Sequence, residues 1–234
     1  MRTLEVCFSP AMLPYYDLEG KVVVVIDVFR ASSTICVALA NGVKEIIPVR
    51  DIEEARGYRD KGFLVAAERH GEMVDGFILG NSPLSFVGEQ FSGQSVVLTT
   101  SNCTQAIHDV KEAHSIYIGS FGNLDLIAAH LLSMKEDVLL LCAGWRNKYN
   151  MEDTIFAGAL IDILMPHFQM ECDAALTSWH LYNMAKGNIS EFLKSSSHAQ
   201  RLRHLRIGAD IEYCLTPNIA EVVPLFNGYS IMPV

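Results

Sequence analysis

The sequence predicts an α/β protein of three layers (α/β/α), with helices on both faces of a mostly parallel or mixed sheet. Residues 22–26 are five β-branched residues in a row, which is typical of a strand covered on both faces. Similar short apolar runs alternate with helical segments along the chain, and this alternation favours parallel strands joined by crossover helices. No Pro- or Ser-rich linker interrupts the pattern.

The expected strands are short and apolar. Residues 1–6 begin the chain with a β-like run, and residues 22–26 form the most apolar strand. The run 45–49 contains Pro48, which has no backbone N–H to donate and therefore favours a sheet edge or a strand end. The other expected strands are 64–67, 95–99, 116–118 and 138–142, followed by two short pieces at 221–223 and 229–232.

Helical segments lie between these strands. Residues 31–40 end before Asn41-Gly42, a pair that commonly stops a helix. Residues 51–60 open with an acidic first turn, which complements the positive end of the helix dipole. The other expected helices are 102–112, 123–134, 153–164, 174–185, 189–193 and 198–205.

Length and composition favour one domain. The chain has 234 residues, of which 50% are hydrophobic and 19% charged, so it is too apolar for a disordered chain and long enough to bury a core. We expect a single α/β domain over 1–234, or two intimately packed subdomains of about 1–120 and 121–234.

Net charge and cysteine content limit the binding partners and the cellular compartment that can be expected for this protein. A net charge of −9 argues against nucleic acid or an anionic membrane as the main partner. No signal peptide is evident and no apolar run approaches the roughly 20 residues of a membrane span, which predicts a cytoplasmic protein. The six cysteines include no C-x-x-C pair, so zinc sites and disulfides are not expected. A homodimer is expected only because two-fold assemblies are common.

Polar residues gather after four of the expected strands. We call the segment that follows the carboxyl end of a strand its exit. Ligands of open α/β sheets bind beyond these ends, so the four exits are expected to form one site. Each exit combines a carboxylate, a basic group or a hydroxyl-rich helix start. The exits are 27–34, then 68–71 with 80–83, then 99–104, and finally 142–146 with 152–153.

The hydroxyl-rich exits and the arginines indicate an anion site. Free N–H groups and the dipole at a helix start favour phosphate or sulfonate, although the same hydroxyls also serve as ordinary helix caps. Arg30 and Arg69 have planar guanidinium groups suited to an oxyanion, or to a place on the surface. The polar residues at these helix starts are Ser32, Ser33 and Thr34 in one segment, and Thr100, Ser101 and Asn102 in another.

The carboxylates indicate a hard cation beside that anion. Asp27 directly follows a buried apolar strand, where a charge is costly unless it is paired or bound to a metal. Asp27, Glu68 and Asp153 supply the oxygen ligands that Mg²⁺ prefers. Asp153 would equally suit the first turn of a helix.

Several common active sites are excluded. The chain has no P-loop, no dinucleotide glycine motif and no G-x-S-x-G elbow. Phe29 stands where the haloacid dehalogenase phosphatases carry their second aspartate, and Lys148 stands where a tyrosine phosphatase with Cys142 as nucleophile would need arginine.

Four segments in order make the sequence resemble the 2-phosphosulfolactate phosphatase family, magnesium-dependent acid phosphatases associated with coenzyme M biosynthesis. They are 23–35, 68–83, 99–107 and 142–144 with Glu152-Asp153, and a weaker match covers 198–202 and 210–211. The resemblance implies hydrolysis of (2R)-phospho-3-sulfolactate. The chain departs from the usual motifs at Ile78, Cys103 and Ala199; a side chain at position 103 would crowd an anion on that turn.

The resulting hypothesis assigns a role to each candidate residue. Asp27 either binds Mg²⁺, helped by Glu68 or Asp153, or is itself the nucleophile. Arg30, with the N–H groups of 32–34, would hold the transferred phosphate. The alternatives are a phosphatase for another phosphorylated hydroxy acid and a non-catalytic anion-binding relative. The full set of substrate-binding candidates is Ser32, Ser33, Thr34, Arg69, Asn81, Ser82, Thr100, Ser101 and Asn102.

Overall fold

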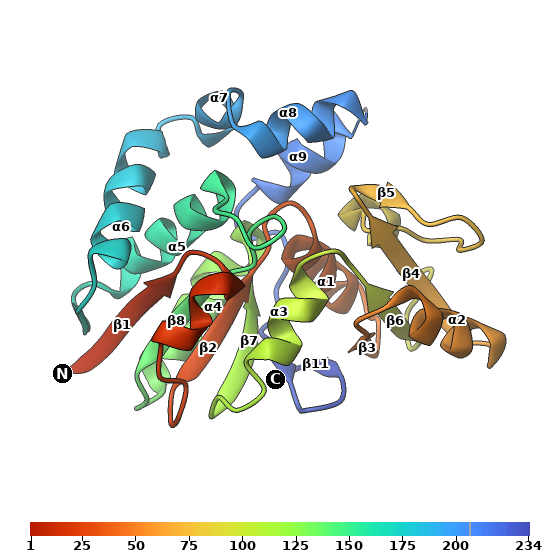
Figure 1. The fold of residues 1–234 in the computed structure, drawn as a ribbon, viewed down its shortest axis with the longest axis horizontal. Coiled ribbons are helices and arrows are strands. Elements are labelled where there is room, and N and C mark those ends of the chain that lie inside the picture. The colour runs from red at the N-terminus through yellow and green to blue at the C-terminus, as the bar shows by residue number, and fades with distance from the viewer. Residues whose placement is uncertain (206) are drawn as a thin grey trace.

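The computed structural model describes residues 1–205 and 207–234. One mixed sheet runs through the molecule and carries helices on both faces (Figure 1), which confirms the predicted fold class. Along the sheet the strands follow the order β5 (Glu72–Met73), β4 (Leu64–Arg69), β6 (Ser95–Thr99), β3 (Glu45–Pro48), β11 (Ile231–Pro233), β10 (Pro224–Phe226), β7 (Ser115–Gly119), β2 (Val22–Ile26), β8 (Val138–Cys142), β1 (Arg2–Cys7) and β9 (Phe168–Met170).

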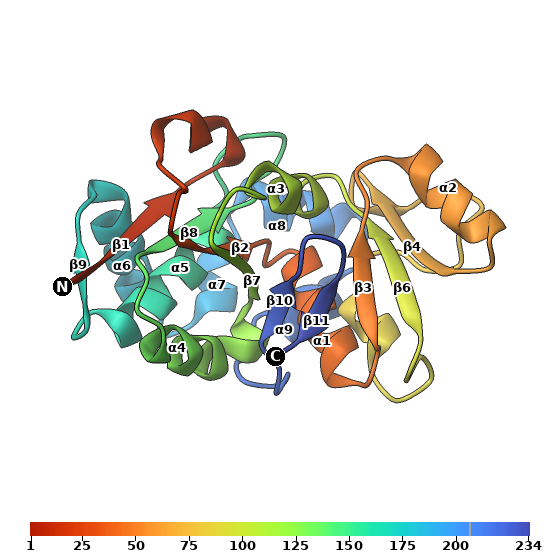
Figure 2. The same cartoon turned by 90° about the horizontal axis from the view of Figure 1, so that it is seen from below.

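The sheet consists of two parallel parts joined by a hairpin. Strands β7, β2, β8, β1 and β9 are parallel neighbours, and so are β3, β6 and β4. The hairpin of β10 and β11 lies between the two parts and pairs antiparallel with β7 and with β3 (Figure 2). The chain passes from the first part to the second and back, because α1 leads from β2 to β3 and α3 leads from β6 to β7.

Strand β2 is the centre of the first part and is buried on both faces. Val22, Val24 and Ile26 belong to one hydrophobic cluster, whereas Val23 and Val25 belong to the cluster on the opposite face. A strand with apolar side chains at every position can be stable only where both faces are covered. The prediction for residues 22–26 is therefore confirmed.

Helices cover both faces of the sheet. Side chains of α1 and α3 share a cluster with one face of β2, and those of α4 and α5 share a cluster with the other. Figure 1 shows α8 and α9 above the strand ends. The α-helices are α1 (Ala31–Ala40), α2 (Ile52–Asp60), α3 (Cys103–Asp109), α4 (Leu124–Ser133), α5 (Met151–Leu164), α6 (Asp173–Ala185), α7 (Ile189–Leu193), α8 (Ser197–His204) and α9 (Gly208–Cys214), and the 3₁₀ helices are η1 (Pro10–Tyr15), η2 (Pro83–Phe86) and η3 (Phe121–Asn123).

Some sequence-based expectations differ from the structure. Strand β3 is not at an edge, because β11 covers its free side; Pro48 is tolerated there as the last residue of the strand. The piece expected at 221–223 forms at Pro224–Phe226, and helix α3 ends at Asp109 rather than at residue 112. The short elements β5, β9 and α9 were not expected, because their sequences have no clear periodicity.

Membrane-spanning helices and disulfides can be examined in the part of the chain that the structure describes. There, none of the helices has the length and apolar character of a membrane span. The six cysteines form no disulfide within the same residues.

Candidate active site

Asp27 lies at the end of β2 and is only 5% exposed. A tight turn fixes the residue: its N–H donates to Ser32 Oγ (3.1 Å), and its carbonyl accepts from the Ser32 N–H (2.9 Å). Burial raises the pKa of the Asp27 carboxyl to about 7, and the negative charges of Glu68 and Glu152 add to this effect against the positive influence of His198. The site thus contains a carboxyl group that the fold holds close to its titration point at neutral pH.

Asp153, in the first turn of α5, connects the exits of β2 and β8. Its Oδ1 accepts from the Val28 N–H (2.9 Å) and its Oδ2 from the Gly144 N–H (3.1 Å). Gly144 is required here, since its φ is +63° and a Cβ would lie 2.2 Å from the Lys148 carbonyl oxygen. Burial raises the Asp153 pKa well above its ordinary value, and the charges of Glu152 and Asp27 raise it further.

Glu68, near the end of β4, connects the exits of β4 and β6. Its Oε1 accepts from the Gly71 N–H (2.5 Å) and the Ser101 hydroxyl (3.1 Å), and its Oε2 accepts from the Ser101 N–H (3.1 Å). The three carboxylates that the sequence singled out are all buried: Asp27 follows β2, Glu68 lies inside β4 rather than after it, and Asp153 of α5 bonds the loop after β8.

Arg30 is held by a buried ion pair with Asp210 of α9. Its Nη1 lies 2.5 Å from Asp210 Oδ2, and its Nη2 donates to the Gly71 carbonyl (2.6 Å). The second oxygen of Asp210 accepts from the Ser82 hydroxyl (2.7 Å). Asp210 thus brings together two candidates, Arg30 and Ser82. Its position belongs to the weak segment 210–211, which was the only signal for it in the sequence.

A cavity opens beside this ion pair. It has a volume of 440 Å³, and Arg30, Asn81, Ser82 and Asp210 are among the residues that line it. Within the described residues the Oδ1 atom of Asn81 is buried without a hydrogen-bond partner. A buried polar atom without a partner is costly, so Asn81 is suited to a polar ligand in this cavity.

The hydroxyl-rich start of α1 is largely occupied with local bonds. The Ser33 hydroxyl donates to the Val28 carbonyl (3.0 Å), and the Thr34 hydroxyl donates to the Asn81 carbonyl (3.3 Å). The Thr34 N–H donates to the Arg30 carbonyl (2.9 Å), as the Ser32 N–H does to Asp27. Two of the three amides expected to receive phosphate are therefore engaged within the turn.

The second polar helix start, which precedes α3, uses its side chains for hydrogen bonds that stabilise the turn before the helix. Thr100 and Thr104 exchange bonds between backbone N–H groups and side-chain oxygens (3.3 Å each), and Asn102 Oδ1 accepts from the Arg146 N–H (3.0 Å). Cys103 is fully buried in the core rather than on the anion-facing side of the turn, whereas Ile78 is 76% exposed. The Cys103 side chain therefore does not crowd the surface of the turn.

Arg69, the last residue of β4, forms hydrogen bonds to residues at or just beyond the ends of nearby strands. Its guanidinium donates to the Glu68 carbonyl (2.6 Å), the Thr99 hydroxyl (2.9 Å) and the Arg50 carbonyl (3.2 Å). Partial burial lowers the pKa of this guanidinium. A second arginine, Arg146, is outside the predicted set; its Nη2 lies 2.9 Å from Nδ1 of His70.

A histidine and a glutamate outside the predicted set form a buried pair. His198 Nδ1 lies 2.5 Å from Glu152 Oε1, and the two side chains are 3% and 0% exposed. The other oxygen, Glu152 Oε2, is buried and has no partner among the described residues. Both positions belong to the segments that carry the resemblance, but nothing in the local sequence pairs them.

The carboxylates do not form a preassembled metal centre. In residues 1–205 and 207–234, no group of three or more His, Cys, Asp and Glu side chains is placed to hold a metal ion. The donor chemistry nevertheless suits a divalent cation, because burial and mutual repulsion disfavour the charged forms of Asp27 and Asp153. Mg²⁺ commonly uses only one or two protein carboxylates, with water and phosphate oxygens as its other ligands.

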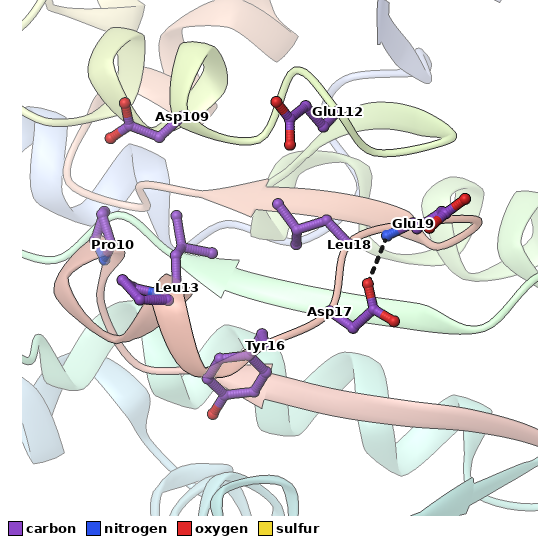
Figure 3. Close-up of a pocket in the computed structure, with 9 residues that line it drawn as sticks. Pro10, Leu13, Tyr16, Asp17, Leu18, Glu19, Asp109 and Glu112 are labelled. Carbon is purple, nitrogen blue, oxygen red and sulfur yellow. Dashed lines mark hydrogen bonds between the residues drawn. The ribbon is translucent and has the colours of Figure 1, made fainter.

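A larger cavity lies elsewhere and has a different character. Its volume is 820 Å³, and Figure 3 shows the side chains around it, from η1, the loop after it and the region of α3. Its charged lining residues are all acidic, namely Asp17, Glu19, Asp109 and Glu112. These charges would repel a phosphate ester, so this cavity is not the candidate site.

Comparison with known proteins gives a consistent result over nearly the whole chain. The family model of 2-phosphosulpholactate phosphatase matches residues 7–228. A probable 2-phosphosulfolactate phosphatase of Thermotoga petrophila is 40% identical over 94% of this chain and 96% of the relative, and that of Thermotoga maritima gives the same values. The relative from Caldanaerobacter subterraneus is 37% identical over 91% and 90%. These matches confirm the resemblance inferred from the motifs.

Proposed function

The chain belongs to the 2-phosphosulfolactate phosphatase family, and on this basis we propose that it hydrolyses (2R)-phospho-3-sulfolactate to 3-sulfolactate and phosphate. The observation that carries the proposal is the convergence of buried carboxylates from separate strand exits, with Asp27 at its centre. The Arg30–Asp210 ion pair and the polar cavity beside it complete the site. The cytoplasmic location, the place in coenzyme M biosynthesis and the homodimer stay predictions of the sequence.

Mg²⁺ is part of this proposal. Asp27 is the first ligand that we assign, with Asp153 of α5 or Glu68 of β4 as the second. When bound, the ion would neutralise charge on the phosphoryl oxygens and lower the barrier to attack on phosphorus. The alternative role for Asp27, nucleophilic attack on phosphorus, uses the same carboxylate and the same surroundings.

The other residues position the substrate. The Arg30 guanidinium, oriented by Asp210, supplies positive charge for the transferred phosphate at the wall of the cavity. Asn81 and Ser82 line the same cavity and offer polar atoms to the sulfonate or carboxylate end. We assign Arg69 and the 100–102 turn to that end of the substrate as well, while their hydrogen bonds support the β4 and β6 exits.

The test is phosphate release from a panel of small phosphorylated acids, measured with Mg²⁺ and with EDTA. We expect phosphosulfolactate to be hydrolysed fastest, and only with the metal. Fastest release from another phosphorylated hydroxy acid would replace the proposed substrate. Binding without release, seen as a thermal shift with phosphosulfolactate, would identify a non-catalytic relative instead. Trapping of a phosphoenzyme would assign the nucleophile to Asp27 rather than to water.

A further inference from the structure

The buried pair of His198 and Glu152 has no role in the function described so far. His198 stands in the first turn of α8, and its Nδ1 faces Glu152 Oε1 at 2.5 Å. Asn150 places its side-chain amide 3.2 Å from the same nitrogen. The other ring nitrogen, Nε2, takes part in none of the hydrogen bonds found among the described residues. One nitrogen of the ring is thus fixed, and the other is left for a ligand.

The ring lies between the two strand exits that carry the aspartates. Its centroid is 6.0 Å from that of Phe29, two residues after Asp27, and 5.3 Å from that of Trp145 in the β8 exit. Electrostatically, His198 is the largest influence that favours the charged form of Asp27. A 270 Å³ cavity lined by His198 and Glu152 reaches the pair from the side of residues 195–197. The imidazole therefore lies beside the loop that carries Asp27, and its side chain lines a small cavity.

A carboxylate at hydrogen-bond distance from one imidazole nitrogen fixes the orientation of the ring and therefore which nitrogen is presented to a ligand. Glu152 Oε2 has no hydrogen-bond partner in the described residues, so the hydrogen bond of Glu152 goes to this ring, while Arg201 is a charged neighbour of the same carboxylate. The pair is far too buried for a surface ion pair, and one removed partner would leave the other charge without compensation. A histidine whose one nitrogen is oriented by a carboxylate is suited to proton transfer at its other nitrogen.

We propose that His198 is the general acid of the reaction, donating a proton from Nε2 to the ester oxygen that leaves with sulfolactate, and that Glu152 is the positioning residue that orients the ring. The proposal rests on the proposed phosphatase function. The leaving oxygen belongs to a secondary alcohol, which is a poor leaving group as the alkoxide, so protonation lowers the barrier.

The step balances without any further reactant. Water attacks phosphorus, the bond between phosphorus and the ester oxygen breaks, and its electron pair stays on the ester oxygen. This oxygen takes the proton from His198 Nε2, giving the sulfolactate hydroxyl and a neutral ring. The H₂PO₄⁻ formed from the attacking water then loses a proton as it becomes HPO₄²⁻, which restores the protonated ring. If Asp27 attacks instead, the same proton reaches the same leaving oxygen.

The test uses the whole protein with Mg²⁺ and two variants of the pair. H198N keeps an amide near the Nδ1 position facing Glu152 but lacks the group at Nε2. We expect kcat to fall on the order of 10²–10⁴-fold, with KM and the dissociation constant of 3-sulfolactate within about threefold of wild type. The same substitution at the exposed His204 in the same helix, H204N, is the matched control and should leave both unchanged.

The double variant separates a catalytic pair from a structural one. E152Q alone should lower kcat, and the loss in H198N/E152Q should be clearly smaller than the product of the two single losses, because Glu152 acts mainly through the ring although its charge also reaches Asp27 and Asp153. A near-normal kcat in H198N would overturn the proposal. So would equal losses of kcat and 3-sulfolactate binding, or additive losses in the double variant, since both indicate a merely structural role.

The wild-type protein shows whether the proposed substrate or the proposed role of His198 is wrong. If it hydrolyses only another ester of the panel, the proposed substrate is wrong, and the variants are then judged on that ester. If it releases phosphate from no ester, both the function and the role of His198 are rejected.

Discussion

Asp27 is a carboxyl group whose charge the folded protein disfavours. Its pKa rises from 3.8 to about 7, first through burial and then through neighbouring carboxylates. The folded state therefore holds this proton more tightly than the unfolded state. The corresponding stabilisation is complete below about pH 4 and is lost as the pH rises through 7.

Replacing Asp27 by asparagine removes this titration. In EDTA, D27N should be more stable than wild type at pH 8 by roughly 1–3 kcal/mol, whereas the difference should shrink or reverse at pH 5. Thermal unfolding at the two pH values measures this. D75N, at an exposed aspartate, is the control.

The same variant should release no phosphate from the substrate while it stays folded. A stability difference that does not change between pH 5 and pH 8 would show that Asp27 does not titrate in this range. Turnover close to that of wild type would remove Asp27 from the reaction.

At the scale of elements, the close packing of α5 against α6 supports the site, because α5 carries both Glu152 and Asp153. Gly158 allows this approach: a Cβ on it would lie 2.0 Å from the carbonyl oxygen of Ser178 in α6. A backbone carbonyl cannot move as a flexible side chain can. The two helices would have to separate to admit even a methyl group.

G158A should therefore lower the free energy of unfolding by at least about 1–3 kcal/mol, the usual effect of overpacking a core. The matched control is G57A in α2, where a Cβ would meet nothing within 4 Å and where alanine should be neutral or slightly stabilising. Urea unfolding compares the two. Equal stabilities for the two variants would mean that α5 and α6 can separate without cost.

Helix α8 packs over the segments that form the candidate site. It delivers His198 to the strand exits, and its Leu202 lies over Gly71, whose N–H and carbonyl bond Glu68 and Arg30. One helix thus contacts groups from the exits of β2, β4 and β8. The helix therefore carries His198, which we propose as the proton donor, and contacts Gly71, which bonds the arginine that we assign to the phosphate.

At the scale of the whole molecule, the C-terminal hairpin joins the two parallel parts of the sheet. Ile231 of β11 pairs with Ile46 of β3 and with Phe226 of β10, and its side chain is fully buried. Although it lies close to the end of the chain, it stands in the middle of the sheet. Its loss should therefore affect both parts.

I231A should lower the free energy of unfolding by about 2–5 kcal/mol and leave one cooperative transition. M232A, at the neighbouring and more exposed position of the same strand, should have a small effect. Circular dichroism and intrinsic fluorescence should give coincident melting curves for I231A. Separate transitions, or a normal melting temperature, would show that the hairpin does not unite the sheet.

Much of the fold was determined by the sequence itself. The five β-branched residues of β2 and the Asn41-Gly42 stop after α1 are local signals, and both elements form at the predicted residues. The alternation of strands and helices also placed Asp27 directly after β2, as predicted, whereas β4 continues to Arg69 and includes Glu68, and Asp153 lies in the first turn of α5. Family membership follows from ordered motifs of the same kind.

Only the tertiary structure decided which distant residues meet. Arg30 and Asp210 are 180 positions apart and His198 and Glu152 are 46 apart, yet each pair is in hydrogen-bond contact. Pro48 indicated a sheet edge or a strand end; it is the end of β3, and only the C-terminal hairpin beside β3 excludes the edge. Periodicity and capping act over a few residues, whereas these contacts depend on the path of the whole chain, and burial then sets the charge state of the groups that it brings together.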